Sequence, residues 1–181
     1  MIRIGGSNPG SILDGTFVRK LGRFDVVYSW GVLHHTGAMC EAIENTAQLV
    51  VPGGTLALAL YRKTPLCWFW ALEKEWYCRA SETAQARVRG LYVGLLRAAF
   101  TLVRRDFSSY VSNYSGHRGM DFAHDVYDWL GGHPYESIGP DDLNKMLGQL
   151  SFRQVRANVH SAAIGLFGSS CNEYVYRRTP G

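Results

Sequence analysis

Residues 24–37 read FDVVYSWGVLHHTG, and this stretch decides how the rest of the chain is interpreted. Apart from Asp25 at its entry, the segment FDVVY is an apolar run of the kind that occurs in a strand covered on both faces, as in a parallel sheet. Two adjacent histidines, His34 and His35, follow the strand, and a helical pattern begins soon after them. A strand that only packs into a core has no use for two imidazoles at its tip. The stretch therefore indicates an edge of a sheet that binds a ligand.

The next segments complete one βαβ unit. Residues 39–51 carry apolar side chains at helical spacing. Pro52, Gly53 and Gly54 are expected to end that helix, because proline cannot continue it and glycine adopts the backbone angles of a helix end. Residues 55–61, TLALALY, predict a second buried strand. Strand, helix and strand in this order predict a parallel pair with a right-handed crossover.

Helices and a final hairpin are predicted after the second strand. Residues 65–105 have the periodicity of two helices, residues 106–137 form a polar and aromatic loop region, and residues 140–150 form a short helix that begins with proline. Residues 152–160 and 173–177 predict two strands joined by a glycine-containing loop, which suits an antiparallel hairpin at a sheet edge. The expected fold class is α/β, with parallel strands, a C-terminal antiparallel hairpin and a helical insertion.

The composition is that of a globular domain without a specialised charge pattern. The chain has 181 residues, of which 46% are hydrophobic and 19% charged, so residues 1–181 can form a single domain with a sizeable core. The net charge of +4 comes from scattered lysines and arginines, which form no nucleic-acid-binding patch. Four cysteines without a C-x-x-C pair predict reduced thiols in a cytoplasmic protein, and no metal site. No apolar stretch reaches the ~18 residues that indicate a transmembrane helix.

The two helices expected in residues 65–105 allow two interpretations. The first helix, LCWFWALEKEWYC, carries three tryptophans, and the second has arginines around an apolar face. One interpretation is a helical cap, residues 65–137, that packs on the sheet domain. The other is an amphipathic element in peripheral contact with a membrane, because tryptophan and arginine suit a lipid–water boundary.

The motif FDVVYSWGVLHHTG, followed by a helix and PGGTLALALY, resembles the second half of a class I S-adenosylmethionine-dependent methyltransferase. The similarity is greatest to the group that contains small-molecule and quinone methyltransferases, and it is clearest over residues 10–61. In that family a strand, a vLHH turn, a helix, PGG and a further strand follow one another. The resemblance implies a partial Rossmann-like methyltransferase sheet, S-adenosylmethionine as cofactor, and methyl transfer to a small-molecule acceptor, with oxygen the favoured acceptor atom.

The resemblance also implies a set of cofactor-binding residues. Ligands of a doubly wound sheet bind beyond the carboxyl ends of the strands, and residues 29–33 lie at such an end. Trp30 offers a flat apolar wall, and Gly31 lets the backbone approach a ligand closely. The loop GSILD, residues 10–14, is similar to the family's loop beside the adenine. The cofactor contacts implied in this way are Ser11, Ile12, Ser29, Trp30, Gly31 and Leu33.

The front of the family's domain has no counterpart in this chain. The family's glycine-rich cofactor loop is absent, since IGGSNPG at residues 4–10 has no strand before it and no helical pattern after it. The acid that holds the ribose in the family is absent as well. We therefore expect a methyltransferase domain that is truncated at its N-terminus. The isolated chain should bind S-adenosylmethionine weakly or not at all.

Methyl transfer depends on alignment of the two reactants, and a base is needed only when the acceptor must lose a proton. The candidate catalytic residues are His34 at the strand tip, and His124 and Asp125 in the segment RGMDFAHDVYDWLGG. If part of that segment is helical, Asp121, His124, Asp125 and Asp128 share a face. Such a face suits an internally paired surface or acceptor binding better than a metal site. The expected acceptor contacts are His35, Arg118, Asp121 and Tyr135.

Two other classes of function stay open at the level of the sequence. One is a non-catalytic, methyltransferase-like domain that binds a partner. The other is a membrane-surface protein built around the tryptophan- and arginine-rich helices. Both differ from the enzyme in needing no cofactor.

Overall fold

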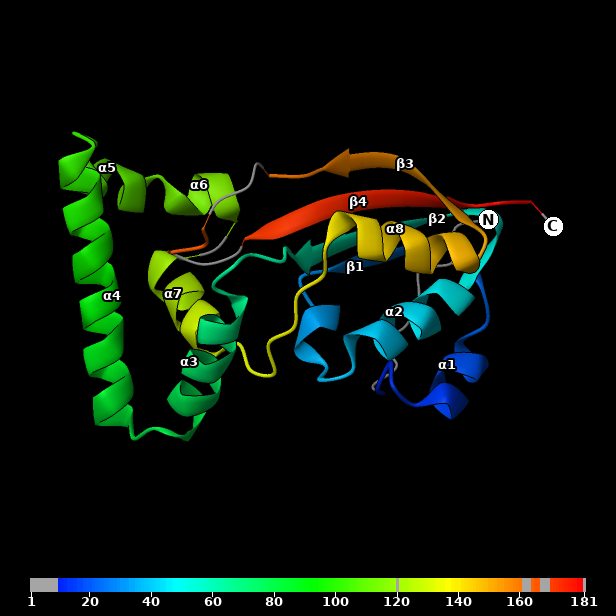
Figure 1. Cartoon of the computed structure of the whole chain (residues 1–181), viewed down its shortest axis with the longest axis horizontal. Helices are drawn as coiled ribbons and strands as arrows, with labels where there is room; N and C mark the ends of the chain where they lie inside the picture. Colours follow the sequence, from blue (N-terminus) through cyan, green and yellow to red (C-terminus); the bar gives the residue numbers. More distant parts are fainter. Residues whose placement is uncertain (1–9, 120, 161–163, 167–169, 181) are drawn as a thin grey trace. The chain divides into compact units, whose positions relative to one another are not determined.

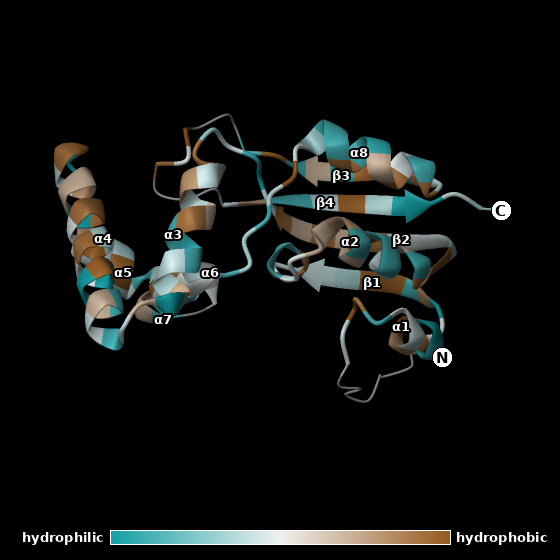
Figure 2. Ribbon diagram, turned by 60° about the horizontal axis from the view of Figure 1, so that its bottom comes forward, coloured by the Kyte–Doolittle hydropathy of each residue, from teal (hydrophilic) through white to brown (hydrophobic). Residues whose placement is uncertain are grey.

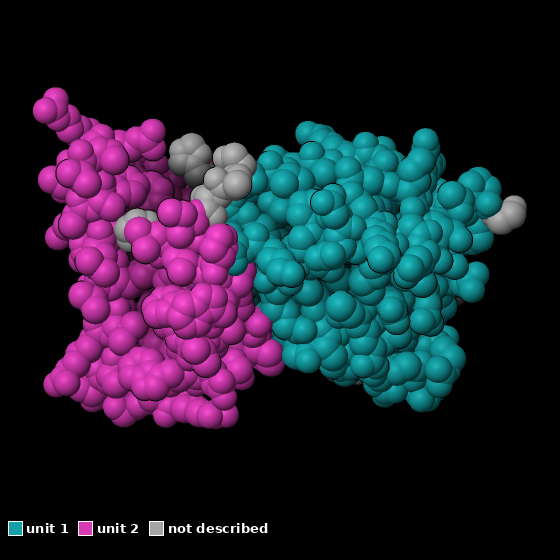
Figure 3. All heavy atoms as spheres, in the orientation of Figure 1, with its two compact units in different colours: residues 1–64, 136–163, 169–181 teal, residues 65–135, 164–168 magenta. Residues whose placement is uncertain are grey.

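The structure, a computed structural model, describes residues 10–119, 121–160, 164–166 and 170–180; of residues 117 and 118 it describes the backbone alone. The chain divides into two compact units (Figure 3). The first consists of residues 1–64, 136–163 and 169–181 and holds the described strands, so we call it the sheet unit. The second, the helical unit, consists of residues 65–135 and 164–168.

Four strands form one mixed sheet. β1 (Phe24–Trp30) pairs in parallel with β2 (Val50–Tyr61). β2 pairs antiparallel with β4 (Cys171–Arg178), which in turn pairs antiparallel with β3 (Phe152–Asn158). The order across the sheet is therefore β1-β2-β4-β3 (Figure 1). The parallel pair and the closing antiparallel hairpin confirm the predicted α/β fold class.

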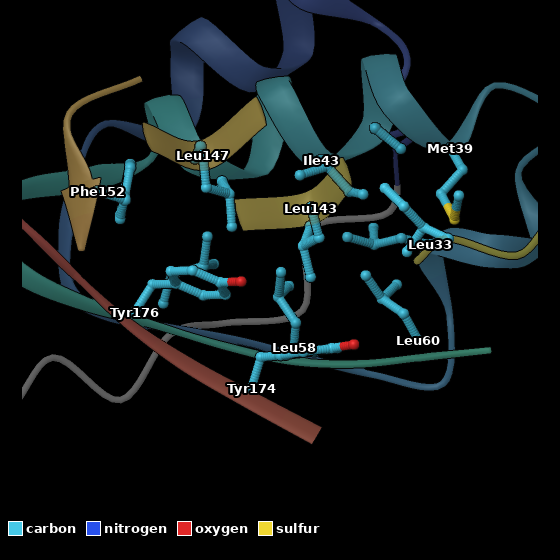
Figure 4. Close-up of a cluster of buried hydrophobic side chains, with 14 of the residues drawn as sticks. Leu33, Met39, Ile43, Leu58, Leu60, Leu143, Leu147, Phe152, Tyr174 and Tyr176 are labelled. Carbon is cyan, nitrogen blue, oxygen red and sulfur yellow. The ribbon is translucent and has the colours of Figure 1, made fainter. Parts of the chain in front are cut away.

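One face of the sheet is covered by helices. α2 (Met39–Gln48) and α8 (Pro140–Gln149) lie on the same side of the strands, together with the short 3₁₀ helix η1 (Leu33–His35) (Figure 1). Both helices were predicted, α2 by its apolar periodicity and α8 by the proline at its start. Their inward side chains meet those of β2 and β4 in one buried cluster (Figure 4). The cluster includes Leu33, Met39, Ile43, Leu58, Leu60, Leu143, Leu147, Phe152, Tyr174 and Tyr176.

The opposite face of β1 is open, which corrects the prediction of a strand covered on both sides. Side chains alternate between the two faces of a strand, so Val26, Tyr28 and Trp30 share one face. Their exposed fractions are 64%, 65% and 43%. Val27, on the other face, packs against the core cluster. Within the described residues β1 is also a terminal strand of the sheet, with β2 as its one neighbour.

A helix precedes β1, where the sequence pattern predicted none. α1 (Gly15–Leu21) begins at Asp14, whose carboxylate accepts hydrogen bonds from the backbone N–H groups of Thr16, at 2.8 Å, and Phe17, at 3.2 Å. It ends at Gly22, which has a φ of 78°. An aspartate cap and a terminal glycine are the ordinary signals of helix ends, so the missed helix was present in the sequence as its two termini.

The prediction that Pro52, Gly53 and Gly54 end α2 is wrong. That helix ends earlier, at Gln48, and the three residues lie within β2. They form an irregularity in the pairing, because Phe24 pairs with Val50 whereas Val26 pairs with Thr55. Gly54 is packed so tightly that an added Cβ would come within 2.9 Å of the carbonyl oxygens of Asp25 and Val51. The PGG motif therefore shapes the strand rather than the helix.

The helical unit contains five helices among its described residues. α3 (Cys67–Arg79) and α4 (Glu82–Leu102) confirm the two helices predicted for residues 65–105. The segment predicted as a polar loop region contains three more: α5 (Phe107–Ser112), α6 (Tyr114–Arg118) and α7 (Phe122–Gly131). In the part of the chain that the structure describes, no helix combines the length and hydrophobicity needed to cross a bilayer.

α3 and α7 are joined by a buried lysine. The Lys74 side chain is 0% exposed, its Nζ donates a hydrogen bond to the backbone carbonyl of Trp129, and it lies 3.5 Å from the centre of the Trp129 ring. Trp70 and Trp129 meet edge to face beside it, with 5.4 Å between ring centres. Burial lowers the pKa of Lys74 and raises the pKa of the neighbouring Glu73. The interior of this small unit is thus partly ionic and partly aromatic.

Candidate functional site

The turn that follows β1 lies at the carboxyl end of a parallel strand pair. Trp30, the last residue of β1, stacks on Tyr28 with 5.2 Å between ring centres and 2° between ring planes. Gly31 has a φ of 74°, a conformation that side-chain-bearing residues rarely adopt, and its N–H donates to the carbonyl of Ala59 at 3.1 Å. A Cβ at Gly31 would meet nothing within 4 Å. The turn therefore offers an exposed aromatic face and open space beside its backbone.

His34 does not face that open space. Its side chain is 1% exposed, and Nδ1 accepts a hydrogen bond from the backbone N–H of Tyr61 at 3.3 Å. The ring packs against Tyr61 with 3.8 Å between ring centres. Burial, reinforced by the charge of His35, lowers the pKa of His34 to about 3. His34 is thus a neutral, buried residue that fastens η1 to the end of β2.

The neighbours of His34 divide between the core and the surface. Leu33 is 3% exposed and belongs to the core cluster, so its side chain points away from solvent. His35 is half-buried and meets Tyr61 edge to face, with ring centres 5.2 Å apart. Of the predicted residues in this segment, Trp30 is the most accessible to a ligand.

Glu136 supports the same segment from a distant part of the sequence, which the sequence analysis missed. Its backbone N–H donates to the carbonyl of His34 at 3.0 Å, and its Oε2 accepts from the backbone N–H of Met39 at 2.9 Å. The carboxylate therefore sits at the first turn of α2, where a negative charge is favourable. No local pattern predicts a cap that is 97 residues away along the chain.

The loop predicted to border the adenine is fixed in place by its own polar groups. Ser11 Oγ accepts a hydrogen bond from the backbone N–H of Leu13 at 3.2 Å. The carbonyl of Ser11 accepts one from the backbone N–H of Asp14 at 3.0 Å. The carbonyl of Ile12 accepts from Asn45 Nδ2 of α2 at 2.9 Å. Ile12 also packs against the core cluster that contains Leu33. The sheet unit thus holds both predicted cofactor segments on one core.

The remaining candidates lie in the helical unit. Asp121 caps α7, accepting hydrogen bonds from the backbone N–H groups of Ala123 and His124, and these bonds lower its pKa. Its Oδ1 also lies 3.5 Å from His124 Nδ1, on the surface. Asp125 accepts a hydrogen bond from the hydroxyl of Tyr114. The segment is helical from Phe122, and its polar groups are divided between a surface pair, Asp121 with His124, and an internal contact of Asp125.

Two predicted acceptor contacts fall outside that face. Tyr135 is 9% exposed, and its hydroxyl donates to Cys67 Sγ at 3.3 Å. The side chain of Arg118 lies outside the described residues. Among the residues that the structure describes, no three histidine, cysteine or acidic side chains are placed to hold a metal ion.

A groove of about 700 Å³ lies between α4 and α7 of the helical unit. Its walls are mainly apolar, with His124, Arg89 and Tyr127 as the polar groups. The remaining lining residues are Gly90, Val93, Phe122, Ala123 and Val126. Sequence reasoning did not find the groove, because it requires two helices that are 20 residues or more apart to be placed side by side.

Comparison with known proteins identifies the fold. No family model and no curated protein matches the chain. PKMT2 from Rickettsia typhi in complex with AdoHcy matches with a TM-score of 0.53 and 11% identity, over 92% of this chain and 37% of that one. A second structure of PKMT2 from Rickettsia typhi matches with a TM-score of 0.50 and 13% identity, over 91% of this chain and 37% of that one. An O-methyltransferase family protein from Burkholderia thailandensis matches with a TM-score of 0.48 and 14% identity, over 95% of this chain and 35% of that one.

The likeness to PKMT2 confirms the predicted class I methyltransferase fold at the level of architecture. The chain spans little more than a third of the length of these three solved structures.

Proposed function

We propose that the chain forms part of an S-adenosylmethionine-dependent methyltransferase that acts on a small-molecule acceptor, with oxygen as the favoured acceptor atom. The observation that carries the proposal is the turn from Ser29 to Gly31. It lies at the carboxyl end of a parallel strand pair, where sheets of this class bind their ligands, and it pairs an exposed indole face with open space at a glycine. PKMT2, a neighbour in fold, was solved with AdoHcy.

In this proposal the sheet unit holds the cofactor. Trp30 supplies an apolar wall, and the open space at Gly31 lets the backbone approach the ligand, with Ser29 and Leu33 as the neighbouring backbone contacts. The loop at Ser11 and Ile12 borders its nucleoside end. The cofactor would supply the methyl group and the positive sulfur from which it leaves. The buried His34 acts as a positioning residue, since it holds the turn and has no exposed nitrogen with which to contact the acceptor.

The helical unit supplies the acceptor site in this proposal. The groove between α4 and α7 has the apolar walls that suit an aromatic or aliphatic acceptor, and His124 lies on its lining. A hydroxyl acceptor must lose a proton as it is methylated, and an exposed imidazole can receive that proton. Asp121, 3.5 Å from His124 Nδ1, orients the ring, and Asp125 supports the same helix through Tyr114.

Nuclear magnetic resonance tests the cofactor part of the proposal. The ¹⁵N-labelled full chain would be titrated with S-adenosylhomocysteine to millimolar concentration, because weak binding is expected. The amide signals of Ser29 to Leu33 should shift progressively, while that of Gly94 in α4 should not. Trp30→Ala should abolish the shifts, whereas Trp76→Ala, which also removes an exposed tryptophan, should leave them unchanged. Shifts confined to segments other than residues 29–33 and the loop at Ser11 and Ile12, or shifts that persist unchanged in Trp30→Ala, would refute the proposed cofactor site.

A further inference from the structure

One face of α4 is apolar and uncovered. None of the 21 residues of this helix is buried. Leu91, Leu95 and Leu102 are 64%, 55% and 84% exposed, and their spacing of four and seven residues places them on one face. Figure 2 shows the hydrophobic residues distributed along α4 in brown. Scattered exposed leucines need no explanation, but a row of them along one helix face marks a surface that contacts something else.

The other side of α4 holds the helix in its unit. Arg89 donates a hydrogen bond to the hydroxyl of Tyr77 at 2.6 Å, and its guanidinium lies 5.4 Å from the centre of the Tyr127 ring. Phe100 meets Phe107 of α5 edge to face, with ring centres 5.5 Å apart. The apolar row is therefore presented outward by a helix that is fixed on its inner side.

The charge of residues 82–105 indicates which kind of partner could cover the leucine row. Residues 82–105 contain one acidic residue, Glu82, and five arginines, a net charge of +4, which equals the net charge of the whole chain. Arg87, Arg104 and Arg105 are exposed. A partner that fits this face must combine negative charge with an apolar layer. An anionic lipid surface has both, at the depth that leucine and arginine reach on an amphipathic helix.

α3 provides an internal comparison. It also exposes an apolar row, Trp68, Leu72 and Trp76, but its two acids are balanced by one lysine and one arginine. The positive charge that suits an anionic partner is therefore found on α4 and not on α3.

We propose that the helical unit docks on anionic phospholipid surfaces through the exposed face of α4, with the helix lying along the surface. The leucine row enters the boundary between headgroups and acyl chains, and the arginines contact phosphate groups. This role is independent of the proposed methyl transfer, because the groove residues of α4 point to its opposite side.

Vesicle co-sedimentation of the full chain tests the proposal. The chain should bind vesicles that contain phosphatidylglycerol, bind phosphatidylcholine vesicles far less, and lose affinity as salt is added. Arg104→Gln with Arg105→Gln should weaken binding by about 25-fold, since each arginine near an anionic surface contributes roughly fivefold. Leu91→Gln with Leu95→Gln should weaken it by about tenfold or more. Leu72→Gln in α3, which replaces a leucine of 59% exposure, is the matched control and should have little effect.

The possible outcomes separate lipid from protein partners. Circular dichroism first verifies that each variant keeps the helix content of the wild type. Absence of binding to anionic vesicles overturns the proposal, and so does equal binding by the wild type and the α4 variants. A loss in Leu72→Gln as large as in the α4 variants would place the contact elsewhere. A dimer in sedimentation equilibrium that Leu91→Gln with Leu95→Gln dissociates, without vesicle binding, would identify a second copy of the chain as the occupant.

Discussion

The Nδ1 atom of His34 accepts a hydrogen bond from the backbone N–H of Tyr61, with 3.3 Å between the two nitrogens. This bond ties the turn after β1 to the end of β2, its parallel neighbour. An imidazolium has no lone pair with which to accept, so the bond exists only when the ring is neutral. Its burial and the bond together favour the neutral form, in line with a pKa of about 3.

We expect the sheet unit to lose stability as the pH falls from about 6.5 toward 3. In this interval the unfolded chain binds a proton at His34 and the folded chain does not, because the folded pKa is depressed. The free energy of unfolding then decreases by about 1.4 kcal/mol per pH unit from this residue. His34→Asn, whose side-chain oxygen can take the place of Nδ1 without titrating, should remove that part of the slope. Urea unfolding between about pH 5 and pH 7 measures both slopes.

The control for this prediction is His133→Asn, because His133 is exposed and the variant keeps His34. It should retain the slope of the wild type. Equal slopes in the wild type and in His34→Asn would contradict the prediction.

The cap that Glu136 provides for α2 should be measurable as stability. Glu136→Ala leaves the backbone N–H of Met39 without its carboxylate partner and should lower the free energy of unfolding by about 1 kcal/mol. Glu136→Gln keeps an acceptor oxygen and loses the charge, so its effect should be smaller. Glu44→Ala removes an exposed carboxylate of α2 and serves as the reference. An effect of Glu44→Ala as large as that of Glu136→Ala would show that charge alone, and not the cap, is responsible.

Gly54 should not tolerate a side chain, because two of its nearest neighbours are backbone atoms. A Cβ there would lie 2.9 Å from two carbonyl oxygens, which belong to the backbone and cannot move aside cheaply. Gly54→Ala should therefore destabilise by roughly 1–3 kcal/mol in urea unfolding. Gly94→Ala is the counterpart in α4, where an added methyl group meets nothing within 4 Å. It should stabilise its helix by up to about 1 kcal/mol, because alanine is the better helix former. Two changes of the same sign would be inconsistent with this account.

Calorimetric titration addresses the affinity of the isolated chain for S-adenosylmethionine. We expect no micromolar binding, because the described sheet ends at β1, so a ligand beyond this strand would be covered by described strands on one side only. If the chain bound with a micromolar dissociation constant, the prediction of a deficient site would be wrong, while the assignment of the Trp30 turn could still hold. The resonance titration described above distinguishes these two outcomes.

The sequence was informative where the signal is local. Apolar periodicity predicted α2, α3 and α4, and the proline at its start predicted α8. Apolar runs predicted the strands, and the order of elements along the chain predicted their parallel and antiparallel pairing. The PGG motif was misread because proline and glycine also mark irregular strands, and the local pattern does not distinguish the two. α1 was missed because its apolar residues are few, although Asp14 and Gly22 mark both of its ends.

The site was harder to predict from the sequence, because the role of each candidate residue depends on whether its side chain is buried. The same two imidazoles could lie at a ligand or under a helix, and only the packing shows that His34 is 1% exposed. The role of Glu136 depends on a contact across 97 residues, and the groove beside His124 depends on how two helices pair. Such relationships leave no periodic trace in the chain.

In the described sheet, β1 has a neighbouring strand on one side only, so the backbone groups on its other side face no strand. It also carries four exposed apolar side chains. Anything that binds this strand in the folded state alone will raise the apparent melting temperature by mass action. The melting temperature of the sheet unit should therefore report whether β1 is bound. It should not change on dilution if nothing binds β1, and it should rise with protein concentration if copies of the chain assemble there. A simple dilution series would report which condition holds before any ligand is known.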